Sequence, residues 1–267
     1  MESFSIIQPS PSLAPYVRHY WALDASPSSI PQRIIPSGCI QLVLHKGSRL
    51  LSLNQQQLQP SAFISGQSTG YGDLKQTGSV SMIVVVFQPY GARTFFDMPM
   101  SELNGQDISF SELNDPLLNE LHERIAAEDD TNSCIDLIET VLLKRLLSFK
   151  EYDYKRMLAV IQHINQLATA SAASMADVAC LSYRQLNRVF SGYVGATPKE
   201  FLRVVRFQRA LYHLQTEPTA SFTQLAYSCG FYDQSHMVKE FKALSGLTPS
   251  ELIALCPPHS DYFSQAI

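Results

Sequence analysis

The carboxy-terminal half of the chain carries one motif twice. The segment "MADVACLSYRQLNRVFSGYVGATPKEFL", which begins at Met175, aligns with "LAYSCGFYDQSHMVKEFKALSGLTPSELI", which begins at Leu225, when a gap of one residue is allowed. Each copy reads as a short helix, a tight turn, a second helix with a capping residue, and a glycine turn that leads into another capped helix. Because two helices joined by a turn of three or four residues form a helix-turn-helix, the sequence predicts two such units.

Matching residue types occupy the equivalent positions of the two copies. Each glycine turn is followed by a capping box, Thr197–Glu200 in the first copy and Thr248–Glu251 in the second, with proline at the first helical position. The equivalent pairs are Ser182 and Asp233, Leu186 and Met237, Phe190 and Phe241, and Gly195 and Gly246. We therefore expect the first unit at about 171–195, a connecting helix at 198–215 and the second unit at about 221–246.

The second helix of the first copy has an apolar face and a polar face. Leu186, Val189 and Phe190 follow one another at helical spacing, which predicts that they point inward. Arginine can bind guanine, and asparagine can bind adenine, through two hydrogen bonds in the major groove of DNA. A solvated polar face is the ordinary interpretation of a single helix, but the duplication of an outward polar face favours contact with DNA. The predicted DNA-contacting residues are Arg184, Gln185, Asn187 and Arg188.

The second helix of the second copy presents a less charged outer face. Met237 and Phe241 are spaced to point inward. Glutamine and serine can hydrogen-bond to bases, lysine suits a phosphate or a guanine, and Val238 can meet a thymine methyl group. His236 has two interpretations, a base-contacting residue or, as we favour, a residue at the rim of the helix. The predicted DNA-contacting residues are Gln234, Ser235 and Lys239, and we expect most base specificity in the first unit.

The two halves of the chain differ in the sign of their charge. The whole chain has a formal net charge of −4, but residues 1–152 contribute −6 and residues 153–256 contribute +3. A basic part beside an acidic part is typical of a protein in which one part faces a polyanion. This signal is weak by itself, and it adds support to the duplicated motif.

The region 153–256 resembles the AraC/XylS family of bacterial transcription regulators. The resemblance rests on "LAYSCGFYDQSHMVKEFKALSGLTPSEL", with "LNRVFSGYVGATPKEFLRVVRFQRAL" in front of it. It implies two helix-turn-helix units joined by a long helix, which place two recognition helices in successive major grooves on one face of DNA. The family has glycine in the turn before the first recognition helix, where this chain has Cys180. We therefore expect a slightly altered first turn rather than a lost site.

Residues 1–100 read as strands. A β-branched run from Val80 to Phe87, bounded by Gly78 and Pro89, has the length of a buried strand. Two helices are expected within about 112–148. The apolar stripe of the second of these helices favours packing on the β region, and pairing with another subunit is the alternative.

The predicted fold class is α+β with two domains. Residues 1–150 are expected to form a β-barrel regulatory domain with its trailing helices, and the resemblance implies a barrel of the cupin type. A short linker is expected within 148–156. Residues 153–256 are expected to form an all-α DNA-binding domain of seven helices.

Aromatic side chains and one cation in the amino-terminal half suit a small organic ligand. The resemblance implies that this half senses a small-molecule effector or mediates dimerisation, but the identity of the ligand does not carry over. Trp21 as a plain core residue is an equally good interpretation. The candidate ligand-binding residues are Tyr20, Trp21, Arg33 and Tyr71.

Several classes of site and function are disfavoured. The seven histidines form no H-x-H pair, the five cysteines form no C-x-x-C pair, and no phosphate-binding loop or nucleophile motif occurs. We therefore predict no catalytic residue, metal or cofactor, and expect the cysteines to be small buried hydrophobes. No apolar run of about 18 residues occurs, and the start of the chain lacks the pattern of a secretory signal, which predicts a cytoplasmic protein without membrane contact.

The favoured interpretation is a sequence-specific transcription regulator that binds double-stranded DNA at a promoter or operator. An unidentified small-molecule effector, RNA polymerase and a second copy of the chain are the other candidate partners. The alternative is a ligand-binding or interaction module whose helical half docks a protein. A cupin-type enzyme is the third and least favoured candidate.

Overall fold

The computed structural model describes residues 3–146, 151–217 and 221–255, and in these ranges strands come first and helices follow. The strands are β1 Ser3–Ile7, β2 Val17–Ala25, β3 Gln32–Ile34, β4 Gln41–His45, β5 Leu50–Ser52, β6 Gln57–Leu58, β7 Ala62–Ser65, β8 Gly72–Gln76, β9 Val80–Phe87 and β10 Asp107–Ser109. Two 3₁₀ turns, η1 Ala92–Thr94 and η2 Met100–Leu103, precede β10. The helices are α1 Pro116–Ala127, α2 Thr131–Leu146, α3 Glu151–Gln166, α4 Ala172–Ala179, α5 Tyr183–Val194, α6 Pro198–Thr216, α7 Phe222–Ser228, α8 Gln234–Ser245 and α9 Pro249–Leu255.

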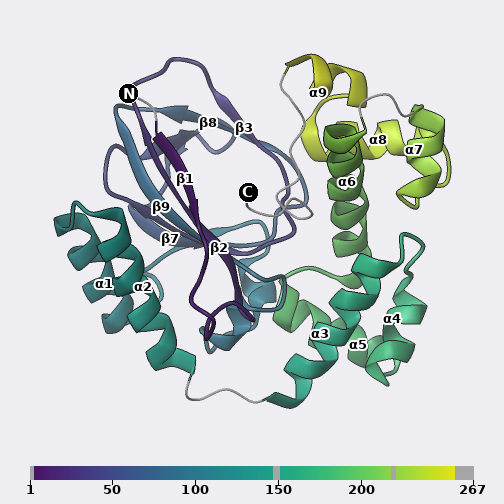
Figure 1. Cartoon of the computed structure of the whole chain (residues 1–267), viewed down its shortest axis with the longest axis horizontal. Coiled ribbons are helices and arrows are strands. Elements are labelled where there is room, and N and C mark those ends of the chain that lie inside the picture. Colours follow the sequence, from purple (N-terminus) through teal and green to yellow (C-terminus); the bar gives the residue numbers. More distant parts are fainter. Residues whose placement is uncertain (1–2, 147–150, 218–220, 256–267) are drawn as a thin grey trace.

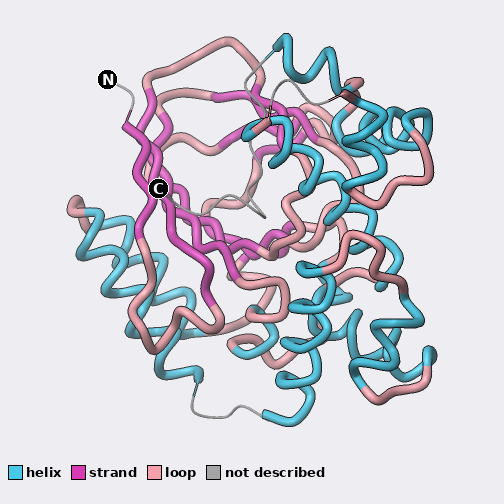
Figure 2. The backbone as a smooth tube through the Cα atoms, turned by 45° about the vertical axis from the view of Figure 1, so that its right-hand side comes forward, coloured by secondary structure: helices cyan, strands magenta, loops and turns pink. Residues whose placement is uncertain are grey.

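The strands form two antiparallel sheets. The larger sheet has the order β1-β2-β9-β4-β7-β10, and the smaller has the order β3-β8-β5-β6. The pairing of the described strands does not close either sheet into a ring. The predicted α+β class is confirmed, as is the buried strand from Val80 to Phe87. Helices lie on two sides of the strands, with α1 and α2 on one side and α3 to α9 on the other (Figures 1 and 2).

One face of the larger sheet packs against α1 and α2. Tyr20 of β2 lies directly opposite Val85 of β9 in the antiparallel pair, so both side chains point to the same face of the sheet. Both belong to an apolar cluster with Leu121 of α1 and with Ile138 and Leu142 of α2. The expected packing of α2 on the β region is therefore confirmed.

The other face of the larger sheet shares an apolar cluster with the first part of the helical half. Phe63 of β7 and Val84 of β9 belong to the same buried cluster as Ile161 of α3 and Phe190 of α5. The cluster continues into the start of α6 through Phe201, which is fully buried. Because this cluster is continuous, the β region and the first helix-turn-helix share one core.

The helix α6 runs between two groups of helices, α3 to α5 and α7 to α9 (Figure 1). Its first turns contribute Phe201 to the cluster shared with the sheet, whereas Phe207 and Leu211 belong to a separate cluster with α7 and α8. Phe207 packs against Phe241 of α8 at a ring-centroid distance of 4.8 Å. The same helix is thus anchored in both clusters, which suits the predicted connecting role.

The two capping boxes predicted from the sequence are confirmed, and a further cap lies at the start of α1. The Asp115 side chain accepts hydrogen bonds from the backbone of Leu117 and Leu118 at the start of α1. Thr197 and Glu200 form a reciprocal capping box at the start of α6. Thr248 and Glu251 form the same arrangement before α9, with bonds of 2.7 and 3.2 Å. These local hydrogen bonds satisfy backbone groups that have no partner inside the helix.

Seven helices occupy the described part of residues 151–255, as expected for the helical half. The domain boundaries themselves stay a prediction. The predicted linker falls partly on residues 147–150, which lie outside the described ranges, and the chain is helical again from Glu151.

The cysteines only partly follow the expectation of burial. Cys39, Cys134 and Cys229 are buried, and burial raises the pKa of the Cys229 thiol to about 11. Cys180 is exposed, so the expectation is wrong for this residue, because it lies in the turn of the first helix-turn-helix. Cys256 lies outside the described residues. Among the described helices, none has the length and hydropathy that crossing a bilayer requires.

Truncation of Phe207 to alanine should destabilise the second cluster. Both Phe207 and Phe241 are fully buried, so Phe207→Ala leaves a cavity and is expected to lower the free energy of unfolding by about 3–5 kcal/mol. Urea denaturation followed by circular dichroism measures the change. The control is Tyr232→Ala, because Tyr232 is 83% exposed and its removal should change stability by less than about 0.5 kcal/mol. Equal stability of the two variants would contradict the assignment of this core.

Candidate nucleic-acid interface

The first helix-turn-helix unit consists of α4, a short turn and α5. Ser171 caps α4 and Ser182 caps α5, each in a reciprocal capping box with the residue three positions later. Of the predicted inward residues of α5, Leu186 and Phe190 are fully buried, and Val189 is half-buried and packs against the same cluster. Val194 is fully buried as well, so the inward face of this helix is the one predicted from the sequence. The opposite face of α5 is therefore free to meet a partner.

Cys180 adopts the left-handed conformation that the turn requires. Its φ is 53° and its ψ is 44°, and the equivalent Gly230 of the second unit has a φ of 81°. The backbone hydrogen bonds also match, since Leu181 donates to Ala176 in the first unit as Phe231 donates to the equivalent alanine in the second. The left-handed residue of the turn is therefore kept, in a backbone conformation that side chains with a Cβ disfavour, so the expected alteration does not occur at Cys180 itself. The first turn is one residue shorter than the second, because α5 is capped at Ser182, two residues after Cys180, whereas α8 is capped at Asp233, three residues after Gly230.

The outer face of α5 brings together three of its four predicted contact residues. Arg184 and Arg188 are exposed and Asn187 is half-buried. Neither arginine forms an ion pair or a hydrogen bond with a residue in the described ranges. Gln185 is exposed as well, but its Oε1 accepts hydrogen bonds from the backbone and hydroxyl of Ser182, at 3.1 and 2.9 Å. Its amide oxygen thus has a capping role, and only its NH₂ group is left to contact DNA.

The outer face of α8 carries the predicted residues of the second unit. Gln234, Ser235 and Lys239 are exposed. The Gln234 Oε1 accepts a hydrogen bond of 2.9 Å from the hydroxyl of Thr223, which fixes this side chain to α7. His236 is half-buried, and its Nδ1 accepts a hydrogen bond of 3.2 Å from the backbone of Tyr232. This contact agrees with the rim interpretation of His236.

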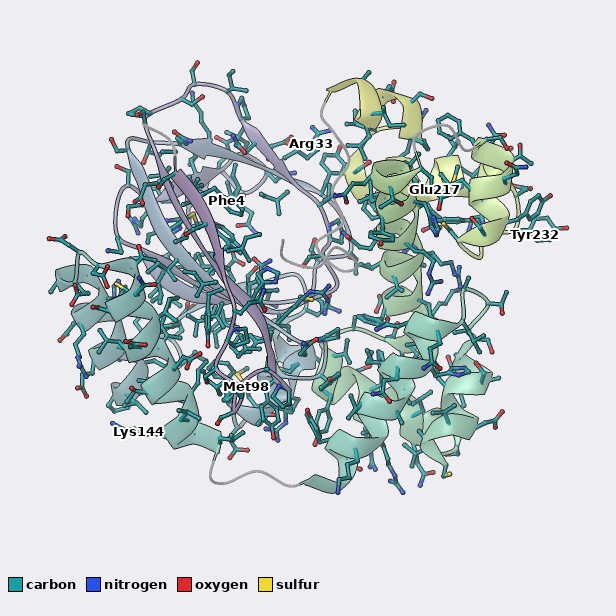
Figure 3. All side chains as sticks on the ribbon, viewed as in Figure 1. Phe4, Arg33, Met98, Lys144, Glu217 and Tyr232 are labelled. Carbon is teal, nitrogen blue, oxygen red and sulfur yellow. The ribbon has the colours of Figure 1, made fainter. Side chains whose placement is uncertain are left out.

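The turn of the second unit projects an aromatic side chain into solvent. Tyr232, just before the cap of α8, is 83% exposed and points away from the molecule (Figure 3). Tyr183, at the first position of α5, is 57% exposed. A tyrosine hydroxyl can donate to a phosphate oxygen, so both residues are suited to contact the DNA backbone. Sequence reasoning missed them because the search for polar outer faces passed over aromatic residues.

Polar side chains join α6 to the helices on either side of it, α8 and α3. The Arg203 Nε donates to the Glu240 Oε2 of α8 at 2.8 Å. Burial lowers the pKa of the nearby Arg206, and the charge of Glu240 partly offsets this effect. The buried Arg209 donates from Nη2 to the backbone oxygen of Ile164, at the end of α3, at 2.8 Å. These contacts were also missed, although buried polar residues that interrupt an apolar helix stripe are a usable signal.

A cavity lies between the two sheets of the amino-terminal half. Its volume is about 580 Å³, within the range of small-molecule sites in proteins. Phe4, Trp21 and Ile34 supply apolar lining, and His19 and Arg33 add polar groups. The Phe4 and Trp21 rings lie 6.0 Å apart. The structure thus brings two of the four candidate ligand residues to one cavity.

The other two candidate ligand residues lie elsewhere. Tyr20 follows the opposite face of β2, where it is fully buried and its hydroxyl donates to the Glu139 Oε1 at 3.1 Å. Burial, reinforced by this carboxylate, raises the pKa of Tyr20. Tyr71 lies under the Arg33 guanidinium, whose Cζ is 4.5 Å from the ring centroid. Within the described ranges, no group of three His, Cys, Asp or Glu side chains is placed to hold a metal ion.

Comparison with known proteins gives matches for both halves. A model of a helix-turn-helix domain matches residues 175–254, and a model described as a domain of unknown function (DUF6597) matches residues 5–109. The "HTH-type transcriptional activator RhaS" of Escherichia fergusonii is 35% identical over 79 residues, which cover 30% of this chain and 28% of RhaS. The "HTH-type transcriptional regulator ArgR" of Pseudomonas aeruginosa is 32% identical over 77 residues, which cover 29% of this chain and 23% of ArgR.

These matches span less than a third of the curated relatives. Among solved structures, ToxT from Vibrio cholerae O395 is similar, with 13% identity, a TM-score of 0.48, and coverage of 88% of this chain and 97% of that one. The duplicated motif and the resemblance that it indicates are confirmed by the helix-turn-helix matches.

The substitutions Cys180→Gly and Gly230→Cys should change the free energy of unfolding in opposite directions. Cys180→Gly removes left-handed strain of about 1–2 kcal/mol but adds about 0.5–1 kcal/mol of unfolded-state entropy, so stability should rise by up to about 1.5 kcal/mol. Gly230→Cys should destabilise by more than about 2 kcal/mol, because a Cβ there would lie 2.1 Å from the backbone oxygen of Ala168. Thermal and urea unfolding under reducing conditions compare the two. A large loss of stability in Cys180→Gly would contradict the assigned turn.

Proposed function

We propose that this chain, whose helical half resembles the AraC/XylS family of helix-turn-helix proteins, is a sequence-specific DNA-binding regulator of transcription. The observation that carries the proposal is the pair of capped second helices, α5 and α8, which both turn an exposed polar face to solvent from one connecting helix. A helix of this kind reads base edges in the major groove of DNA. Double-stranded DNA at a promoter or operator is the partner that these faces fit.

The two units are proposed to differ in what they read. Arg184 and Arg188 are exposed and unpaired among the described residues, so each is available to bind guanine through two hydrogen bonds. In the second unit, Gln234 and Ser235 suit bases, and Lys239 suits a phosphate or a guanine. Phosphate contacts position the protein and make its affinity depend on salt. Most base specificity is expected from the first unit.

The amino-terminal half is proposed to bind a small-molecule effector in the cavity lined by Trp21. Apolar walls with a few polar groups are typical of such sites. This proposal includes a role for Arg33 at the cavity and assigns none to Tyr20 and Tyr71. RNA polymerase and a second copy of the chain are proposed as further protein partners, and the cytoplasm as the location. No catalytic residue or cofactor is part of the proposal.

Arg188→Ala should weaken specific DNA binding. The loss of one bidentate contact corresponds to about 1–3 kcal/mol, or roughly a 5- to 150-fold increase in Kd for a specific duplex. Gel-shift titrations, with the duplex first selected from a random pool by the wild-type protein, measure the change. Affinity for an unrelated duplex should fall much less, because that binding rests on phosphate contacts.

The control is Arg124→Ala on α1, which removes an exposed arginine far along the chain from both units. It should leave specific binding unchanged. The proposal fails if the wild-type protein prefers no sequence in the pool. That outcome would favour the alternative in which the helical half docks a protein.

An occupant of the cavity should change the fluorescence of Trp21. The chain has one tryptophan, and its side chain lines the cavity, so emission reports directly on this site. Thermal shift against a panel of metabolites identifies a candidate, and titration followed by Trp21 emission tests its place. A candidate that raises the unfolding temperature without altering the emission binds somewhere else. Trp21→Phe is the control for signal from other aromatic residues.

A further inference from the structure

The two helix-turn-helix units are attached to the β region in different ways. The first unit shares a continuous apolar cluster with the sheet, through Leu186 and Phe190 of α5 and Val84 of β9. The second unit has an apolar cluster of its own, and Ile35 is the described residue of the β region that packs against it. Separation of the first unit from the β region would expose the apolar cluster that the two share, whereas separation of the second unit would leave its own cluster intact.

Polar contacts of residues 33–37, which we name the bridging segment, join α6 and the second unit to the β region. The Gln208 Nε2 of α6, itself fully buried, donates to the backbone oxygen of Pro36 at 2.6 Å. The Arg33 Nη1 donates to the backbone oxygen of Ser245, the last residue of α8, at 3.2 Å. All five residues of the bridging segment also line the cavity, so the same stretch of chain forms part of the cavity wall and contacts the second unit.

Arg33 is held so that its remaining donor points at the end of α8. Its Nε and Nη2 donate to the two carboxylate oxygens of Asp73 at 2.8 and 2.9 Å, and the two residues lie opposite each other in the β3–β8 pair. The guanidinium stacks over Tyr71, which in turn lies against Gly246, so a Cβ added there would come within 2.9 Å of both. Arg33 therefore has a fixed orientation, at the side of β3 that faces α8 and α9 (Figure 3).

The position of the Arg33 charge suits the end of a helix. The last carbonyl groups of a helix have no partner inside it and carry partial negative charge, so a cation there is favourable. Gly246 ends α8 in the left-handed conformation, with a φ of 74°. Arg33 thus supplies, from the other half of the chain, the hydrogen bond that α8 does not make for itself at Ser245.

We infer that Arg33 is a positioning residue that sets the orientation of the second recognition helix relative to the first. This inference rests on the proposed function, because orientation matters only if α5 and α8 read one DNA duplex together. The first unit is fixed by the shared core, so the angle and distance between α5 and α8 depend on α6 and on the contacts of the bridging segment. Without Arg33, the attachment of the second unit to the β region would rest on α6, on the Gln208 hydrogen bond and on the apolar contact of Ile35.

Hydrogen–deuterium exchange of the full chain tests the contact without DNA. Arg33→Ala should make amide exchange in α8 and α9 at least about tenfold faster, the change expected when a charge-assisted hydrogen bond at a helix end is lost. Exchange in α4 and α5 should stay as in the wild type. Arg33→Lys keeps the positive charge but loses the planar guanidinium that donates to Asp73 and to the Ser245 backbone oxygen at the same time. It should therefore behave like Arg33→Ala. Lys75→Ala, an exposed cation of β8, is the matched control and should change nothing.

DNA binding tests the positioning role itself. On a duplex selected by the wild type, one base pair inserted between the two contacted segments should weaken wild-type binding by about tenfold or more, because it rotates and shifts one half-site. Arg33→Ala should lose most of this discrimination while its affinity for the first segment alone stays the same. A merely structural role would weaken binding to all duplexes equally.

The outcomes separate the inference from the proposed function. If the wild type selects no sequence, the proposed function fails, and unchanged exchange in both Arg33 variants then overturns the contact as well. If the wild type discriminates spacing and both Arg33 variants discriminate it equally well, the inference is overturned and the proposed function stands. Should Arg33→Ala fail to fold, Arg33→Lys carries both measurements.

Discussion

The apolar cluster shared by the larger sheet and the first helix-turn-helix is the constraint on which the rest of the structure depends. It buries Phe63 and Val84 of the sheet together with Phe190 of α5 and Phe201 of α6. The first unit cannot detach from the sheet without exposing these side chains to water, and each exposed side chain would cost about 1.5–3 kcal/mol. The first unit is therefore packed against the β region. Because the inner face of α5 is buried in this cluster, the opposite face of the helix is the one exposed to solvent.

The helix α6 carries that constraint to the second unit. It begins in the shared cluster and ends in the separate cluster of α7, α8 and α9, where Phe207 meets Phe241. Arg209 and Gln208, side by side in its middle, bind the end of α3 and the bridging segment. A stiff helix anchored at both ends and in its middle suits a protein that must hold two reading faces at one separation. The capped starts of α5 and α8 then fix which residues those faces present.

The features that the sequence predicted well are local ones. Caps, the glycine turns and the inward faces of both recognition helices depend on residues within a few positions of each other. Gln185 shows the limit of such reasoning, because one spacing predicts both a capping partner and an outward contact, and its amide oxygen is used for the cap. Cys180 shows another, since the sequence could not say that this residue would take the left-handed conformation at the expense of strain. The opposite faces of Tyr20 and Trp21 follow from the period of a strand and could have been predicted. The contact of Arg33 with α8 spans 212 positions, and only the fold brings the two together.

We propose that one chain reads DNA with two helices on the same face of the duplex. Hydroxyl-radical footprinting of the wild-type protein on a selected duplex measures this most directly. Two protected patches are expected on one face, separated by about one helical turn, or roughly 10 base pairs, with the stronger base dependence in the patch of the first unit. A single patch, or protection that is the same on every sequence, would rule out reading by two helices.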